Sequence, residues 1–199
     1  MTKVVLGMTM SLDGIAGPES ADADGMELFE TIMSWVFPLR SWREQQGMEG
    51  GEDSVDSQVW GADFARFGPQ IVGRRMFDYG YPNWGENPPF HAPVFVVTHR
   101  GQERIDKSGG TSYTFVTGGI EAAVEQARAV ADGKDVLLAG GVSTAQQALA
   151  AGLVNEVRVH LVPVLAGRGL PLFGAARAGL RCVDTVQGEG AVHLRYEVR

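Results

Sequence analysis

A pair of adjacent glycines lies between a predicted strand and a predicted helix. Gly140 and Gly141 separate an apolar run from Val142, Ser143 and Thr144, where a helical pattern begins. Glycines let a backbone approach a ligand closely, and a helix N-terminus offers unpaired N–H groups at the positive end of the helix dipole. Together these features are typical of a segment that binds phosphate. A glycine pair alone is more often a tight turn, so the other segments must decide between the two interpretations.

Two further strand ends carry cationic side chains. An arginine can bind two phosphate oxygens at once, and a neighbouring hydroxyl group adds a further donor. Taken singly, an arginine pair at a helix start or a surface histidine is usually a solvated side chain. Their occurrence at strand ends, together with the glycine pair, favours a phosphate-rich cofactor. The residues concerned are Gly73, Arg74, Arg75, Thr98, His99 and Arg100.

The end of the first predicted strand, residues 3–10, carries a hydroxyl group and a carboxylate. Ser11 and Asp13 follow the strand, and Gly14 comes next. A carboxylate in such a place can hold a substrate or relay a proton. An Asp-Gly pair by itself is usually only a turn. Ser11 and Asp13 are therefore candidate ligand contacts at this strand end.

The chain alternates predicted strands with predicted helices and ends in a run of strands. This order predicts an α/β fold with a mixed, mostly parallel sheet, flanking helices and an antiparallel C-terminal hairpin. Ligands bind at the carboxyl ends of the strands in such sheets, so we expect all the strand ends above to share one edge. No linker interrupts the pattern, and we expect a single domain over residues 1–199. Strands are predicted at residues 3–10, 70–72, 93–98, 113–116, 135–139, 156–164, 180–187 and 191–199, helices at 26–39, 53–67, 119–131 and 142–151, and loops at 41–51 and 79–93.

The composition limits the partners of the chain. Its 199 residues carry a net charge of −7 at pH 7, which disfavours nucleic acid or an anionic membrane as the main partner. No apolar run approaches the roughly 20 residues of a membrane-spanning helix. Cys182 is the single cysteine, which fits a reducing cytoplasm. No metal is expected, because no zinc-ligand spacing joins the histidines, which are His91, His99, His160 and His193.

Three common nucleotide or hydrolase motifs do not occur in the sequence. G-x-G-x-x-G does not follow the first strand, and neither a Walker P-loop nor G-x-S-x-G is found. An ordinary Rossmann dinucleotide site, a P-loop NTPase and an α/β-hydrolase are therefore not indicated.

Five ordered segments resemble one protein family. They are MTMSLDGIAG, IVGRRMFDYG, PVFVVTHR, FVTGGIEAAVEQA and VLLAGGVSTAQQALAAGLVNEVRVHLVPVLAGRGLPLF. Over essentially the whole chain they resemble the reductase domain of bacterial riboflavin biosynthesis and its stand-alone, dihydrofolate-reductase-like relatives. The resemblance implies a dihydrofolate-reductase-like three-layer fold, NADPH as hydride donor and a homodimer. Residues 18–69 resemble a helical and loop insertion of an actinobacterial-type variant, whose aromatic residues either pack an extra helix or roof the pocket.

The resemblance also implies roles for individual residues. The segment that cradles the pyrophosphate and the nicotinamide side of NADPH is matched by Gly140, Gly141, Val142, Ser143 and Thr144. A second phosphate-contacting segment is matched by Gly73, Arg74 and Arg75. The segment that meets the adenosine 2′-phosphate is matched by Thr98, His99 and Arg100, and a cation with a hydroxyl group there favours NADPH over NADH. The substrate side is matched by Ser11, Asp13, Val162, Pro163, Val164 and Leu165, with residues 167–169 beside them. Asp13 is the carboxylate that the resemblance places near the reacting ring, so it is the candidate catalytic residue, which holds the substrate or relays a proton.

We therefore expect an NADPH-dependent reductase of a small, heteroaromatic substrate, such as a pterin, a folate or a riboflavin precursor. The cofactor carries the chemistry in such an enzyme, and the protein supplies positioning and electrostatics. One alternative is an NADPH-binding protein without turnover, which keeps the cofactor site but has lost the catalytic acid. Another is an orphan scaffold that dimerises through its C-terminal strands and binds no cofactor. No motif names the substrate.

Overall fold

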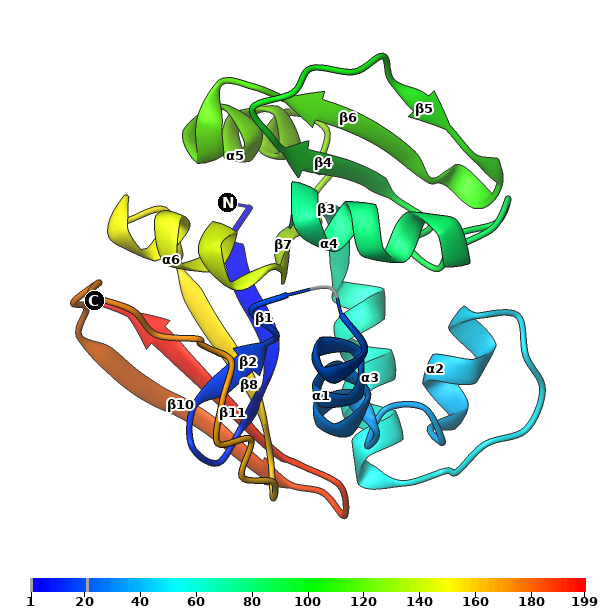
Figure 1. Cartoon of the computed structure of the whole chain (residues 1–199), viewed down its shortest axis with the longest axis vertical. Helices are drawn as coiled ribbons and strands as arrows, with labels where there is room; N and C mark the ends of the chain where they lie inside the picture. The colour runs from blue at the N-terminus through cyan, green and yellow to red at the C-terminus, as the bar shows by residue number, and fades with distance from the viewer. Residues whose placement is uncertain (1, 21) are drawn as a thin grey trace. The chain divides into compact units, whose positions relative to one another are not determined.

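A mixed, mostly parallel sheet of nine strands with flanking helices forms the framework of the chain, as the sequence predicts (Figure 1). The computed structural model describes residues 2–20 and 22–199. The chain divides into two compact units, the first with residues 1–6 and 66–156 and the second with residues 7–65 and 157–199. Strand β1, Val4–Ser11, runs from one unit into the other. The single domain over residues 1–199 stays a prediction. Within the described residues, no helix is long and apolar enough to span a membrane.

The first unit contains the parallel part of the sheet, in the order β1-β7-β3-β4-β6-β5. Strands β7, β3, β4 and β6 pair in parallel, and the short β5 pairs antiparallel with β6. Every residue of β3 is buried, which is typical of a strand covered on both faces. The bounds are β3 Phe67–Gly73, β4 Pro93–Val97, β5 Ile105–Asp106, β6 Ser112–Val116 and β7 Asp135–Gly140.

An aromatic cluster packs against these strands in the first unit. Phe77 stacks on Tyr81 with a ring-centroid distance of 4.8 Å and meets Tyr113 edge-on at 5.2 Å. Phe77 belongs to helix α4, which ends at Gly80. The loop predicted from residue 79 therefore begins after this helix. The helices of this unit are α4 Arg74–Gly80, α5 Gly119–Ala129 and α6 Val142–Ala150, with short 3₁₀ turns at Tyr81–Asn83 and Ser108–Gly110.

The second unit contains the other end of the sheet, in the order β10-β11-β8-β1, where β10 and β11 pair antiparallel. The hairpin of β10 and β11 confirms the predicted antiparallel C-terminal hairpin. A small ribbon of β2 and β9 was not predicted, because its strands span only three and two residues. The bounds are β2 Ile15–Gly17, α1 Ala23–Met33, α2 Arg40–Gln45, α3 Val55–Arg66, β8 Glu156–Val162, β9 Leu170–Pro171, β10 Leu180–Gln187 and β11 Val192–Val198.

The helices of residues 18–69 differ in their bounds from the prediction. Helix α1 begins earlier than residue 26, because the Asp22 carboxylate caps it by accepting a hydrogen bond of 2.9 Å from the Gly25 N–H. It ends at Met33 and is followed by two consecutive turns, in which the Val36 N–H donates to the Met33 carbonyl and the Leu39 N–H donates to the Val36 carbonyl. The predicted loop at residues 41–51 contains α2, and the following strand β3 begins at Phe67 and not at residue 70.

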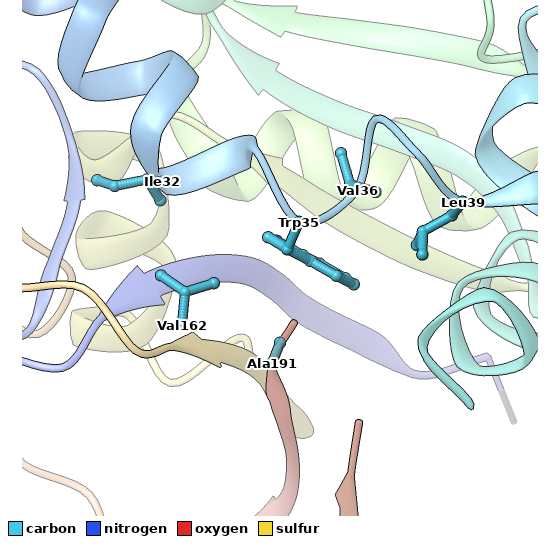
Figure 2. Packing of buried hydrophobic residues seen from close by; sticks show 6 residues of the cluster. All are labelled: Ile32, Trp35, Val36, Leu39, Val162 and Ala191. Atoms are coloured by element: carbon cyan, nitrogen blue, oxygen red, sulfur yellow. The ribbon is translucent and has the colours of Figure 1, made fainter. Parts of the chain in front are cut away.

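Trp35 lies at the centre of the hydrophobic core of the second unit. Figure 2 shows its ring within a cluster formed by the end of α1, the turn after it, the end of β8 and the start of β11. The indole Nε1–H donates to the Thr9 hydroxyl at 3.2 Å, so the buried polar atom of the ring is satisfied. The cluster consists of Ile32, Trp35, Val36, Leu39, Val162 and Ala191.

A buried carboxylate ties α3 to the β10–β11 hairpin within this unit. Asp56 is 2% exposed. Its carboxylate accepts hydrogen bonds from the Glu189 N–H at 2.9 Å, the Gly190 N–H at 2.8 Å and the His193 Nε2–H at 2.7 Å. Because the Nε2–H of His193 donates to the carboxylate, the Nδ1 atom of a neutral His193 carries no proton. This Nδ1 accepts a hydrogen bond of 2.7 Å from the His160 Nδ1–H. The chain of bonds therefore requires a neutral His193, and burial lowers the pKa of His160 to about 3, so both rings have a structural role in the neutral form.

We expect Asp56→Ala to destabilise the protein strongly. The change leaves two part-buried backbone N–H groups and one buried imidazole without their acceptor, and each orphaned group costs up to about 1–3 kcal/mol. The total loss in the free energy of unfolding, measured by urea denaturation, should be about 3 kcal/mol or more. The control is Asp53→Ala, which removes a carboxylate that is 61% exposed and should change stability by less than about 0.5 kcal/mol. Equal effects of the two changes would contradict the anchoring role of Asp56.

We also expect the stability to fall as the pH drops below about 6.5. Burial lowers the pKa of His160 from 6.5 to about 3 and also lowers the pKa of His193. Below about pH 6.5 the unfolded chain binds more protons than the folded chain, so acid favours unfolding, by at most about 1.4 kcal/mol per pH unit for each histidine. Urea denaturation between pH 7 and pH 5 measures this slope. His160→Gln should reduce the slope, whereas a slope unchanged from the wild type would exclude the proposed linkage, and the exposed His99→Gln serves as control.

Candidate functional site

Three of the strand ends singled out in the sequence lie side by side in the first unit. Val72 of β3 pairs with Gly140 of β7, and Gly73 pairs with Val97 of β4. The strands are parallel, so their carboxyl ends meet at one edge of the sheet. The structure thus brings the segments that begin at residues 73, 98 and 140 together.

The glycines at this edge leave room that a side chain would remove. A Cβ atom on Gly73 would lie 2.6 Å from the Thr144 hydroxyl oxygen and 3.5 Å from the Gly141 nitrogen. Gly140 has a φ of 138°, which a residue with a side chain rarely adopts, and its peptide bond to Gly141 is cis. A Cβ on Gly141 would meet nothing within 4 Å, so the backbone there borders open space. A ligand can therefore approach the backbone of Gly141.

Helix α6 begins directly at this open space. Gly141 is its N-cap and has no side chain to bind the first N–H groups of the helix. Ser143 is exposed, while Val142 and Thr144 are buried, so Ser143 is the residue of this turn whose side chain faces solvent. The uncapped N–H groups and the positive end of the helix dipole form a suitable seat for a phosphate.

Two arginines from different strand ends share one carboxylate beside the glycines. Arg74 Nε donates to Asp78 at 2.7 Å, and the Arg100 guanidinium donates to the other oxygen of Asp78 at 3.2 Å. The Arg74 guanidinium also lies over the rings of Phe77 and Phe115, at 5.6 Å from each centroid. Arg74 is thus fixed on several sides, whereas the side chain of Arg100 is 71% exposed. We call Arg74, Asp78 and Arg100 the arginine–aspartate cluster.

The remaining residues of the cationic segments have different surroundings. Thr98 is 7% exposed, and its hydroxyl oxygen accepts a hydrogen bond of 3.0 Å from the Arg100 N–H, which orders the start of the loop. His99 and Arg75 are exposed. Among the described residues, no group of three His, Cys, Asp or Glu side chains is placed to hold a metal ion.

Asp13 closes a loop of the second unit. Its carboxylate accepts hydrogen bonds from the Ser11 hydroxyl at 2.6 Å and from the N–H groups of Ala166 and Gly167 at 3.0 and 2.7 Å. These donors, the Ser11 hydroxyl first, lower the pKa of Asp13 to about 2. Ser11 is fully buried and also accepts from the Ile15 N–H at 2.9 Å. Asp13 is therefore ionised at neutral pH and holds the loop of residues 164–167 in place.

The structure brings the two predicted substrate segments of this unit together. The Leu12 N–H donates to the Val164 carbonyl at 2.8 Å. Leu12 and Leu165 are 62% and 74% exposed, so two leucines lie on the surface next to the Asp13 loop. Pro163 is exposed as well, whereas the side chain of Val162 is buried in the Trp35 cluster and does not face solvent.

Sequence reasoning missed two residues of these sites. Asp78 had a usable signal, because it lies four residues after Arg74 in a segment that can start a helix, where such pairs meet. Leu12 had none, since nothing local distinguishes an exposed leucine in a turn from a buried one.

The sequence of the chain matches a known protein family over nearly its whole length. The model of the RibD C-terminal domain matches residues 2–194. The chain belongs to the RibD C-terminal domain family. This confirms the resemblance seen in the sequence and places the chain in a family of oxidoreductases. The Bacillus subtilis (strain 168) protein YyaP, described as uncharacterized, is 30% identical over 172 residues, covering 75% of this chain and 87% of its own.

Solved structures share the fold of this RibD-type chain. A putative riboflavin biosynthesis protein from Shewanella sp. PV-4 has a TM-score of 0.70 and 19% identity, with 100% of this chain and 99% of that chain covered. A diaminohydroxyphosphoribosylaminopyrimidine deaminase/5-amino-6-(5-phosphoribosylamino)uracil reductase from Thermotoga maritima has a TM-score of 0.59 and 13% identity, and the match covers 57% of it. Dihydrofolate reductase from Enterococcus faecalis, complexed with NADP(H), has a TM-score of 0.58 and 11% identity, with 99% of this chain and 96% of that chain covered. The fold is therefore dihydrofolate-reductase-like, as expected.

We expect Gly73→Ala to distort this edge of the sheet, because the new Cβ would lie 2.6 Å from the Thr144 hydroxyl oxygen. Such overpacking costs about 1–3 kcal/mol. Combining it with Thr144→Ala removes the clashing oxygen, so the double variant should be more stable than the sum of the single changes predicts, by about 1 kcal/mol. Urea denaturation of all four proteins measures this coupling.

The control for this cycle is Gly101→Ala. Its Cβ would make an ordinary contact of 3.7 Å with Thr117, and stability should stay near that of the wild type. Strict additivity of the Gly73 and Thr144 changes would show that the two residues are not in contact.

Proposed function

We propose that the chain is an NADPH-dependent reductase of a small, flat, heteroaromatic molecule. The observation that carries the proposal is the meeting, in the first unit, of the uncapped α6 N-terminus, the open backbone at Gly141 and the arginine–aspartate cluster. Each binds phosphate by a different means: a helix dipole, close backbone approach and guanidinium groups. A dinucleotide carries phosphates at separated points and needs more than one such element.

The residues of the first unit suit NADPH in chemistry. The N–H groups at the start of α6 would bind the pyrophosphate, because no side chain caps them. Arg74, Arg100 and the Thr98 hydroxyl would bind the adenosine 2′-phosphate. When bound, NADPH supplies the hydride; the contribution of the chain is to bind and orient the reactants.

The second unit supplies the residues that we assign to the substrate. Leu12, Leu165 and Pro163 present an apolar surface, which suits contact with a flat ring. Asp13 acts as a positioning residue here, because its lowered pKa leaves no proton to donate at neutral pH and its oxygens hold the loop of residues 164–167. The sequence resemblance also implies a homodimer, and the single cysteine fits a reducing cytoplasm; we keep both as parts of the proposal.

The engagement of Asp13 also favours a second candidate, an NADPH-binding protein without turnover. Asp13 is the carboxylate that we predicted for proton transfer, and it already accepts three hydrogen bonds from groups of the protein. The two candidates differ in one measurement: the loss of NADPH absorbance with a panel of pterins, flavin precursors and quinones. Oxidation of NADPH with any of these supports the reductase, and binding without oxidation by any of them supports the second candidate.

NADPH binding tests the proposal, with Arg100→Ala as the informative variant. We expect saturable quenching of protein fluorescence by NADPH at submillimolar concentration. Arg100→Ala should weaken NADPH binding about tenfold or more, because a hydrogen bond to a charged group contributes about 1.5–3 kcal/mol, and should affect NADH less. The control is Arg104→Ala, which removes an exposed arginine paired with Asp106 and should leave binding unchanged. Absence of saturable NADPH binding by the wild type would refute the proposed function.

A further inference from the structure

Asp78 places a negative charge in the middle of a site that otherwise attracts anions. Its carboxylate joins Arg74, which follows β3, to Arg100, which follows β4. A surface ion pair of this kind adds little stability, because water screens it and ordering long side chains has an entropic cost. Asp78 is therefore a charge that lies between two candidate phosphate-binding arginines without adding much to stability, and any ligand that these arginines bind meets it.

The cluster retains free hydrogen-bonding capacity of both signs. A carboxylate has about four acceptor positions, and each oxygen of Asp78 accepts one hydrogen bond from an arginine. At least one position on each oxygen is left for a hydroxyl donor. The side chain of Arg100 is 71% exposed, and its guanidinium has further N–H groups that do not bond to Asp78. These groups can bind an anion.

We propose that the arginine–aspartate cluster accepts both NADPH and NADH, with Arg74 and Arg100 binding a ribose 2′-phosphate and Asp78 accepting the ribose 2′-hydroxyl. The inference rests on the proposed function and names a second cofactor for the same site. A carboxylate that accepts the 2′-hydroxyl favours the cofactor without a phosphate, and arginines favour the cofactor with one. Asp78 thus sets the preference between the two dinucleotides.

The direction of the effect follows from the charges. A 2′-phosphate carries between one and two negative charges at neutral pH and is repelled by Asp78, whereas a 2′-hydroxyl donates to it. Two arginines without a carboxylate would favour the phosphate by more than about 100-fold, since each charged hydrogen bond contributes tenfold or more. With Asp78 present we expect the wild type to bind the two forms within about 100-fold of each other.

Fragments of the cofactor isolate this end of the site. Adenosine 2′,5′-bisphosphate and adenosine 5′-monophosphate differ only in the 2′-phosphate, and neither contains nicotinamide. Isothermal titration of the wild type, Asp78→Asn and Asp106→Asn with both fragments, and with NADPH and NADH, gives the ratio of the dissociation constants directly. Asp106→Asn removes the same charge from an exposed pair with Arg104 in the same unit and is the matched control.

We expect Asp78→Asn to bind the bisphosphate more tightly and the monophosphate more weakly, which shifts their ratio about tenfold or more towards the bisphosphate. The same shift should appear in the ratio of NADPH to NADH and shrink at high salt, a response that a purely structural role would not produce. Asp106→Asn should leave both ratios within about twofold of the wild type.

The outcomes separate this inference from the proposed function. Wild-type binding of NADPH, with a ratio that Asp78→Asn leaves unchanged or moves towards NADH, overturns the role of Asp78 and leaves the reductase proposal standing. Wild-type binding of NADPH more than about 100-fold tighter than NADH overturns the dual site in the same way. Absence of NADPH binding by the wild type overturns both.

Discussion

Parallel pairing of β3 with β7 and β4 is the constraint on which the candidate cofactor site depends. It places Gly140 beside Val72 and Gly73 beside Val97, so residues far apart in the sequence become neighbours at one edge. The strand in the middle, β3, is buried along its whole length. A slip of one residue would exchange its two faces and disrupt the packing on both, so the register is strongly specified. The glycines, the start of α6 and the arginines are positioned by this register.

Local charge, and not the net charge of the chain, determines what this edge attracts. The protein as a whole carries −7, yet two arginines and an uncapped helix start lie at the same edge of the sheet. Such a cluster attracts a phosphate at short range although the whole chain is acidic, because salt largely screens charges that lie more than about 10 Å away. Asp78 moderates the attraction, and a moderate site can distinguish between ligands that differ in one phosphate.

The second unit depends on polar groups that are buried and satisfied. Asp56, His193 and His160 form a chain of hydrogen bonds beneath Trp35, and α3 is thereby fixed to the hairpin of β10 and β11. The aromatic residues of the predicted insertion, residues 18–69, pack here: Trp35 and Trp60 lie 5.0 and 6.2 Å from the His160 ring. Of the two roles that the sequence allowed for them, the structure supports packing against the body of the unit.

The sequence by itself determined most of the alternation of strands and helices, the family resemblance, and, to within a residue or two, where the parallel strands end. These follow from local patterns, because burial, glycine conformation and helix periodicity leave their marks over a few consecutive residues. Only the tertiary structure decided that Asp78, four residues after Arg74, also binds Arg100, that Asp13 holds residues 164–167, and that Val162 is buried. Asp78 and Arg100, and Asp13 and residues 166–167, are far apart in the sequence. Which side chains meet over such distances along the chain depends on strand register and on the path of each loop, and no local sequence pattern encodes either.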